Sequence, residues 1–106
     1  MMSRTRLTNV LRLKAGCEDE YKRRHDELWE DMRRLLSAAG IENYTIWLAA
    51  GLLFEYMETN DVVRLRETLE KNEVKRRWDD YMSDIVEQTG WETRLMLELD
   101  GGGTNG

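Results

Sequence analysis

The chain has 106 residues, of which 41% are hydrophobic and 35% are charged, and its formal net charge is −5. This length supports one domain with one modest core, and no apolar run is long enough to cross a bilayer. The acidic balance argues against a general nucleic-acid binder. The first residues lead into no signal-peptide core, and a single cysteine, Cys17, fits a reducing compartment, so we expect a cytoplasmic protein.

The N-terminal third predicts one strand and one long helix. Apolar and polar side chains alternate over residues 5–14, which indicates a half-buried strand, with Asn9 on the same side as its leucines. Acidic residues 18–20 then place negative charge in the first turn of a helix. We expect this helix over residues 17–39, with Gly40 as its stop. Arg23 and Arg24 are predicted to lie on its solvated face, with a ligand or partner contact as the alternative.

The remainder of the chain predicts three strands and two helical segments. Residues 43–48 and 52–58 indicate a hairpin joined at 49–51. Asp61 and Asn72 are suitable caps for two helical segments, the second of which has an apolar stripe that includes Trp78. Alternation over residues 93–100 predicts a fourth strand. We expect one domain over residues 1–100 and a flexible Gly-rich tail over 101–106.

This order of elements, β-α-β-β-α-β, favours an α+β protein with a ferredoxin-like antiparallel sheet and helices on one face. So short a chain leaves the other face of the sheet uncovered, and leucine and methionine residues occur on both sides of several strands. We therefore expect a homodimer in which a second copy covers that face.

One stripe on the long predicted helix carries the only histidine. Residues at helical spacing share a face, and this stripe consists of Tyr21, His25, Trp29, Met32 and Leu36. Histidine is the residue type that exchanges protons near neutral pH, and aromatic neighbours suit a small, partly apolar ligand. The stripe thus indicates proton-transfer chemistry at His25. The alternative is a buried histidine that is hydrogen-bonded to a backbone carbonyl.

Two further aromatic residues, Tyr44 and Trp78, are candidates to join His25. Aromatic rings stack on the apolar faces of sugars, and the tyrosine OH and indole NH bond to ring substituents. The alternative is that both residues belong to the core. No Cys/His cluster has metal-ligand spacing and no Gly-rich phosphate loop is present, and we do not expect Cys17 to be catalytic.

Several blocks occur in an order that resembles the L-rhamnose mutarotase family. They are Tyr21-Lys22-Arg23-Arg24-His25, Trp29, Ala39-Gly40-Ile41-Glu42-Asn43-Tyr44, Leu52-Leu53-Phe54, Arg77-Trp78-Asp79-Asp80-Tyr81-Met82-Ser83-Asp84-Ile85 and Leu99-Asp100. The resemblance implies a dimeric α/β barrel of ferredoxin-like protomers and an isomerase that interconverts the anomers of a monosaccharide. It also implies that His25 is the proton donor and that Tyr21, Tyr44 and Trp78 contact the substrate.

The chain departs from the pattern of that family at a few positions. Asp79 stands where the family has a second tryptophan, and Glu27 and Glu30 stand where it has prolines. A carboxylate beside Trp78 adds polar contacts and removes a stacking surface, so we count Asp79 among the substrate-binding residues. The departure leaves open whether the sugar is L-rhamnose or a related deoxy-sugar.

Mutarotation requires one proton to reach the ring oxygen of a hemiacetal and another to leave its anomeric hydroxyl. One group that titrates near the working pH can serve both steps, so we expect no metal and no organic cofactor. The partner of His25 is a tyrosine hydroxyl, a water molecule or Asp79. The alternative functions are another small dimeric-barrel enzyme, such as a monooxygenase, and a non-catalytic sugar-binding or interaction module.

Overall fold

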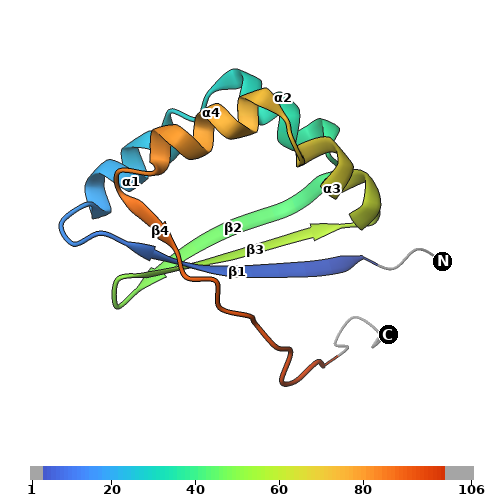
Figure 1. The fold of residues 1–106 in the computed structure, drawn as a ribbon. Coiled ribbons are helices and arrows are strands. Elements are labelled where there is room, and N and C mark those ends of the chain that lie inside the picture. Colours follow the sequence, from blue (N-terminus) through green and yellow to red (C-terminus); the bar gives the residue numbers. More distant parts are fainter. Residues whose placement is uncertain (1–3, 100–106) are drawn as a thin grey trace.

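The structure is a computed structural model, and it describes residues 4–99. The elements, in chain order, are β1 (Thr5–Leu13), α1 (Glu18–Asp26), α2 (Glu30–Ala38), β2 (Ile41–Ala49), β3 (Leu52–Thr59), α3 (Val62–Leu69), α4 (Glu73–Met82) and β4 (Val86–Gln88). The strands form one antiparallel sheet in the order β2-β3-β1-β4. The helices lie on one face of this sheet (Figure 1). The predicted α+β, ferredoxin-like order is therefore confirmed.

The core lies between the sheet and the helices. Alternation along β1 and β3 points Leu11, Leu13 and Leu53 toward the helices, and Leu53 is only 1% exposed. The helices contribute a set of large apolar side chains to the same cluster: Met32, Leu35, Trp78 and Met82. Full burial of one such side chain stabilises the fold by roughly 1.5–3 kcal/mol, so this face supplies most of the driving force for folding.

Local signals in the β2–β3 hairpin and at two helix starts behave as predicted. The turn between β2 and β3 uses positive φ at both Ala50 (54°) and Gly51 (77°), as short hairpins with the right-handed strand twist require. The carboxylate of Asp61 accepts a bond from the backbone NH of Arg64, and the amide oxygen of Asn72 accepts bonds at the start of α4. These short-range interactions depend on neighbours in sequence, which is why the chain alone reveals them.

The prediction of a single helix over residues 17–39 is wrong, because α1 ends at Asp26 and α2 begins at Glu30. Trp29 between them is extended (φ −56°, ψ 139°) and its ring packs against Trp78 of α4. No proline or glycine marks the break. The charges do mark it, since basic residues occupy the last turn of α1 and acidic residues the first turn of α2, as the macrodipoles of two separate helices favour.

The prediction of a fourth strand over residues 93–100 is also wrong. β4 is a three-residue strand, Val86–Gln88, that pairs with residues 11–13 of β1. Residues 89–99 form no regular element, and Leu95, Met96, Leu97 and Leu99 are exposed. Alternation predicts a strand with two different faces, but a strand also needs a partner strand, and residues 93–99 pair with none. The expected tail over 101–106 lies outside the described residues.

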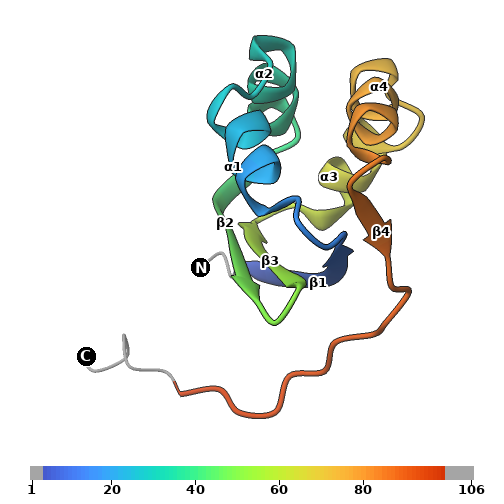
Figure 2. The ribbon, with the colours of Figure 1, turned by 90° about the vertical axis from the view of Figure 1, so that its left-hand side faces the viewer.

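The segment after β4 follows the outer face of the sheet, opposite the helices (Figure 2). Thr89 Oγ1 donates a hydrogen bond to the carbonyl of Val10, and the guanidinium of Arg12 lies 5.4 Å from the centre of the Trp91 ring. Farther along this face, Trp47 and Phe54 pair across β2 and β3 and remain 68% and 40% exposed. In residues 4–99, no helix is long and apolar enough to span a membrane.

Candidate functional site

His25 lies one turn after Tyr21 on α1, and the two rings stack with centroids 4.2 Å apart. His25 Nδ1 lies 3.0 Å from the backbone carbonyl oxygen of Tyr21. A carbonyl only accepts, so Nδ1 carries the hydrogen and Nε2 is the nitrogen left to exchange a proton with a ligand. The carbonyl bond that the sequence suggested as an alternative role is therefore present, but His25 is half-buried rather than enclosed.

A cavity of about 350 Å³ lies beside His25, between α1 and the inner face of the sheet. Its lining consists of Leu13, Glu18, Tyr21, Lys22, His25, Asp26, Ile46, Leu48 and Leu53. The floor is apolar, whereas the α1 wall carries the imidazole, a phenol and charged side chains. Binding sites for small molecules commonly combine an apolar lining with a few polar groups in this way.

Trp78 of α4 packs edge-on against His25, with ring centroids 5.5 Å apart at 89°. The same indole meets Trp29 edge-on at 5.1 Å, and Trp29 stacks on Tyr81 at 5.3 Å. Trp78 is only 8% exposed, so most of its surface belongs to the core, as the alternative interpretation of this residue held. The structure thus brings Tyr21, His25 and Trp78 together, and the contact of Trp78 with a substrate stays a prediction.

Tyr44 of β2 is half-buried and opens onto a second hollow beside α2. Its hydroxyl donates a 2.8 Å hydrogen bond to Glu55 Oε2. Burial, followed by the charge of Glu55, raises the pKa of both Tyr44 and Tyr21 above the usual tyrosine range. Both hydroxyls are therefore protonated at neutral pH, where they act as hydrogen-bond donors and not as bases.

Asp79 lies on the exposed side of α4, and its Oδ2 accepts a 2.6 Å hydrogen bond from Lys75 Nζ. Asp79 does not line the cavity beside His25, so its contact with a substrate stays a prediction. The placement agrees with the geometry of a helix, in which adjacent residues such as Trp78 and Asp79 point about 100° apart.

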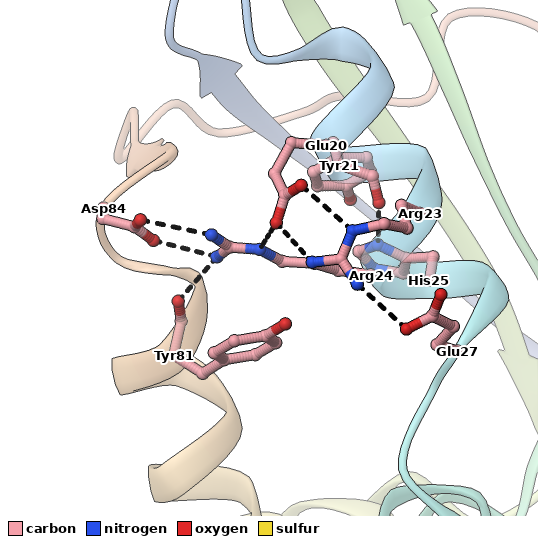
Figure 3. A network of polar contacts seen from close by, with 8 residues as sticks. All are labelled: Glu20, Tyr21, Arg23, Arg24, His25, Glu27, Tyr81 and Asp84. Atoms are coloured by element: carbon pink, nitrogen blue, oxygen red, sulfur yellow. Dashed lines mark hydrogen bonds and ion pairs between the residues drawn. The ribbon is translucent and has the colours of Figure 1, made fainter.

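Arg24 connects α1 to the end of α4, as Figure 3 shows. Its side chain is 9% exposed, and two of its nitrogens donate to Asp84 at 2.9 and 3.2 Å. A further bond of 2.8 Å reaches the carbonyl of Tyr81, and Nε donates to Glu20 at 2.7 Å. Bidentate arginine–carboxylate pairs are geometrically specific, so this contact fixes the position of the helix that carries His25.

The bonds from Arg24 also change the acid–base behaviour of its partners. They hold the pKa of Asp84 below its usual range, and those from Arg23 and Arg24 together lower the pKa of Glu20 to about 2. The prediction of a solvated face is correct for Arg23, which is exposed, and wrong for Arg24. Spacing along the helix does not separate the two, because both lie within one turn of Glu20 and bond to it, whereas only Arg24 reaches Asp84.

Two polar residues that the sequence analysis did not single out as site residues, Asn9 and Glu55, lie on the inner face of the sheet. They are direct partners across β1 and β3, and Asn9 Nδ2 donates to Glu55 Oε1 at 3.1 Å. The available signal was an interruption of the apolar pattern, since Asn9 lies between inward Leu7 and Leu11, and Glu55 lies between inward Leu53 and Met57. Among residues 4–99, no three side chains of the His, Cys, Asp or Glu type are grouped as metal ligands.

Comparison with known proteins places the chain among sugar isomerases. The family model described as L-rhamnose mutarotase matches residues 6–99. L-rhamnose mutarotase of Listeria monocytogenes serovar 1/2a is 36% identical over 96 residues, which cover 89% of this chain and 91% of the relative. The corresponding protein of Flavobacterium johnsoniae is 38% identical over 80 residues, or 74% of each chain.

Solved structures agree with this assignment. L-rhamnose mutarotase of Formosa agariphila superposes with a TM-score of 0.70 at 26% identity, over 89% of this chain and 99% of the other. Tetracenomycin F2 cyclase of Streptomyces glaucescens, a type-II polyketide cyclase, reaches a TM-score of 0.68 at 14% identity, over 90% and 96% of the two chains. So distant a likeness reflects the fold alone. The match of the family model and the identity to curated relatives show that the chain belongs to the L-rhamnose mutarotase family of isomerases.

Proposed function

We propose that this protein interconverts the α and β anomers of L-rhamnose or a related deoxy-sugar, with His25 as the proton donor. The observation that carries the proposal is the orientation of His25. Its Nδ1 is bonded to the Tyr21 carbonyl, and the ring borders a cavity of about 350 Å³, in a chain of the mutarotase family. Tyr21, Tyr44, Trp78 and Asp79 are the residues we propose to contact the sugar.

The reaction needs two proton movements and one broken bond. The protonated imidazole gives its Nε2 proton to the ring oxygen as the bond from that oxygen to the anomeric carbon breaks. The anomeric hydroxyl loses its proton to a base, and a free aldehyde forms. After rotation about one carbon–carbon bond the steps reverse, and the proton returns to Nε2. Because raised pKa values keep Tyr21 and Tyr44 protonated, the base is a water molecule or a carboxylate.

The test is an NMR measurement of exchange between anomers for a panel of aldoses, with and without the protein. We expect catalysed exchange for L-rhamnose and weaker or no exchange for unrelated aldoses. A sugar-binding module would shift or broaden sugar signals without accelerating exchange, and an enzyme of another class on this fold would do neither. Either of these results would reject the proposed reaction.

Asp79 is expected to weaken the preference for the 6-deoxy sugar. A carboxylate accepts hydrogen bonds from hydroxyls but does not stack on a methyl group, whereas an indole does the reverse. Asp79→Trp should therefore shift preference toward L-rhamnose over L-mannose, which differ only at that methyl, by roughly 1–3 kcal/mol. The measurement is the ratio of exchange efficiencies for the two sugars. An unchanged ratio would mean that Asp79, already bonded to Lys75, does not read the substrate.

We further propose a cytoplasmic homodimer that covers the outer face of the sheet. Trp47 and Phe54 form an exposed apolar pair on this face, and residues 95–97, in the segment that follows the same face, are also apolar and exposed (Figure 2). Exposed apolar patches of this kind commonly mark protein interfaces. We expect a dimer at micromolar concentration in sedimentation equilibrium and a monomer for Trp47→Glu, because the new carboxylate would be buried without a partner. A wild-type protein that stays monomeric would contradict the proposal.

A further inference from the structure

Three polar side chains from adjacent strands meet on the inner face of the sheet. Glu55 of β3 accepts a hydrogen bond from the Tyr44 hydroxyl of β2 at 2.8 Å and another from the Asn9 amide of β1 at 3.1 Å. Each carboxylate oxygen has one of these partners. Carboxylates offer about four acceptor positions, so Glu55 keeps unused acceptor capacity.

Glu55 lies at the margin of the cavity beside His25. Its cross-strand partner on β2 is Ile46, and Leu53 precedes it by two residues on the same face; both line that cavity. The charge of Glu55 also raises the pKa of Tyr21, a third lining residue. Glu55 is half-buried and lies on the sheet face that the helices cover (Figure 2).

The charge of Glu55 is not neutralised within the described part of the chain. Among residues 4–99, no lysine, arginine or histidine forms an ion pair with it, although most other acidic groups near the helices have one. The neutral amide and the neutral phenol stabilise the carboxylate through hydrogen bonds but leave its net charge on a largely apolar face. Such a local conflict with packing rules is typical of a functional position.

We propose that Glu55 determines sugar specificity, a proposal that rests on the proposed mutarotase function. Its carboxylate accepts hydrogen bonds from ring hydroxyls of the bound sugar. The same group holds Tyr44, whose hydroxyl oxygen can still accept a bond, and Asn9, whose amide keeps a second N–H to donate. In this arrangement His25 on α1 transfers the proton, and Glu55 on the opposite wall, the sheet, recognises the sugar hydroxyls.

The test is Glu55→Gln, which keeps the volume and the carbonyl acceptor for Tyr44 but removes the charge. A hydrogen bond to a charged group contributes more free energy than a neutral one, and the difference corresponds to about a tenfold change in affinity. We therefore expect KM for L-rhamnose to rise roughly tenfold, whereas kcat should stay within a few-fold of the wild-type value. The same measurements are made on monodeoxy analogues, each lacking one ring hydroxyl. The wild-type protein should discriminate against one of them, and Glu55→Gln should lose most of that discrimination.

Glu58→Gln is the matched control. Glu58 lies on the same strand but on the outer face, and it too accepts bonds from a tyrosine hydroxyl and an asparagine amide, those of Tyr56 and Asn43. Discrimination should be unchanged in this variant. If Glu55→Gln preserves the wild-type ratio for every analogue, or if Glu58→Gln alters the ratios equally, the role of Glu55 in specificity is rejected.

A separate measurement distinguishes failure of this proposal from failure of the proposed reaction. If the wild-type protein does not accelerate exchange, the mutarotase reaction is rejected, and sugar binding is then measured directly by NMR titration. If L-rhamnose binds about tenfold more weakly to Glu55→Gln than to the wild type, the result supports the role of Glu55 in recognising sugar hydroxyls. Equal binding by both proteins, or no binding by the wild type, overturns it.

Discussion

His25→Asn is expected to remove catalysed exchange between anomers while the fold is retained. Asparagine is smaller than histidine, but its amide NH₂ can occupy the position of Nδ1 and donate to the Tyr21 carbonyl, as the imidazole does at 3.0 Å. Asparagine, however, has no group that gives and takes a proton near neutral pH. Positioned acid–base catalysis contributes roughly 10²–10⁴-fold, so the rate should fall by that amount toward the uncatalysed value.

The measurement is NMR exchange at saturating sugar, with circular dichroism and sedimentation as checks on folding and assembly. Binding of the sugar should weaken only modestly, because the cavity and its other lining side chains remain. A variant with wild-type exchange and an unchanged spectrum would show that His25 is structural, stacked between Tyr21 and Trp78 for packing alone.

Arg24→Ala is expected to lower the free energy of unfolding by about 2–3 kcal/mol, since it removes charge-assisted bonds that each contribute about 1.5–3 kcal/mol. The estimate takes the lower end because Asp84 is exposed and regains water when its partner is removed. The buried guanidinium also stacks 4.4 Å from the centre of the Tyr81 ring, and this contact is lost as well. Urea unfolding followed by tryptophan fluorescence measures the change.

Arg23→Ala is the matched control, one residue away on the same helix. Arg23 forms ion pairs with Glu20 and Glu27, but its side chain is exposed, and exposed pairs contribute about 0–1 kcal/mol. Arg24→Lys should recover little of the loss, because an ammonium group cannot bond to Asp84 in the bidentate manner. Equal effects of Arg23→Ala and Arg24→Ala would refute the view that Arg24 fixes α1 against α4.

Short-range patterns account for the part of the fold that the sequence predicted. Alternation identified β1, β2 and β3, and the caps at Asp61 and Asn72 located the starts of α3 and α4. Each of these signals acts within a few residues, through backbone geometry or a local hydrogen bond. The order of the elements then restricted the topology to the observed sheet, because short connections leave few arrangements.

For the site, helical spacing made Tyr21 and His25 candidates, their aromatic character added Tyr44 and Trp78, and the resemblance to the family selected the same four residues. The chain alone could not distinguish Arg24 from Arg23, since burial of Arg24 depends on Asp84, sixty positions away. Nor did it connect Asn9 with Glu55, whose contact exists only because β1 pairs with β3 in one particular register. Contacts between distant segments have no signature in the local pattern of either one.

The same distinction explains both wrong elements. The sequence by itself determined that the region 17–39 favours amphipathic helix and that residues 93–100 alternate. Only the tertiary structure decided that the helix breaks at residues 27–29, where Trp29 turns its ring onto Trp78 and Tyr81 of α4. It also decided that the last alternating segment stays unpaired: the strand that joins β1 at Leu11–Leu13 is β4, and residues 93–99 pair with no strand. Local preference sets what a segment is able to form, and the available packing partners set what it does form.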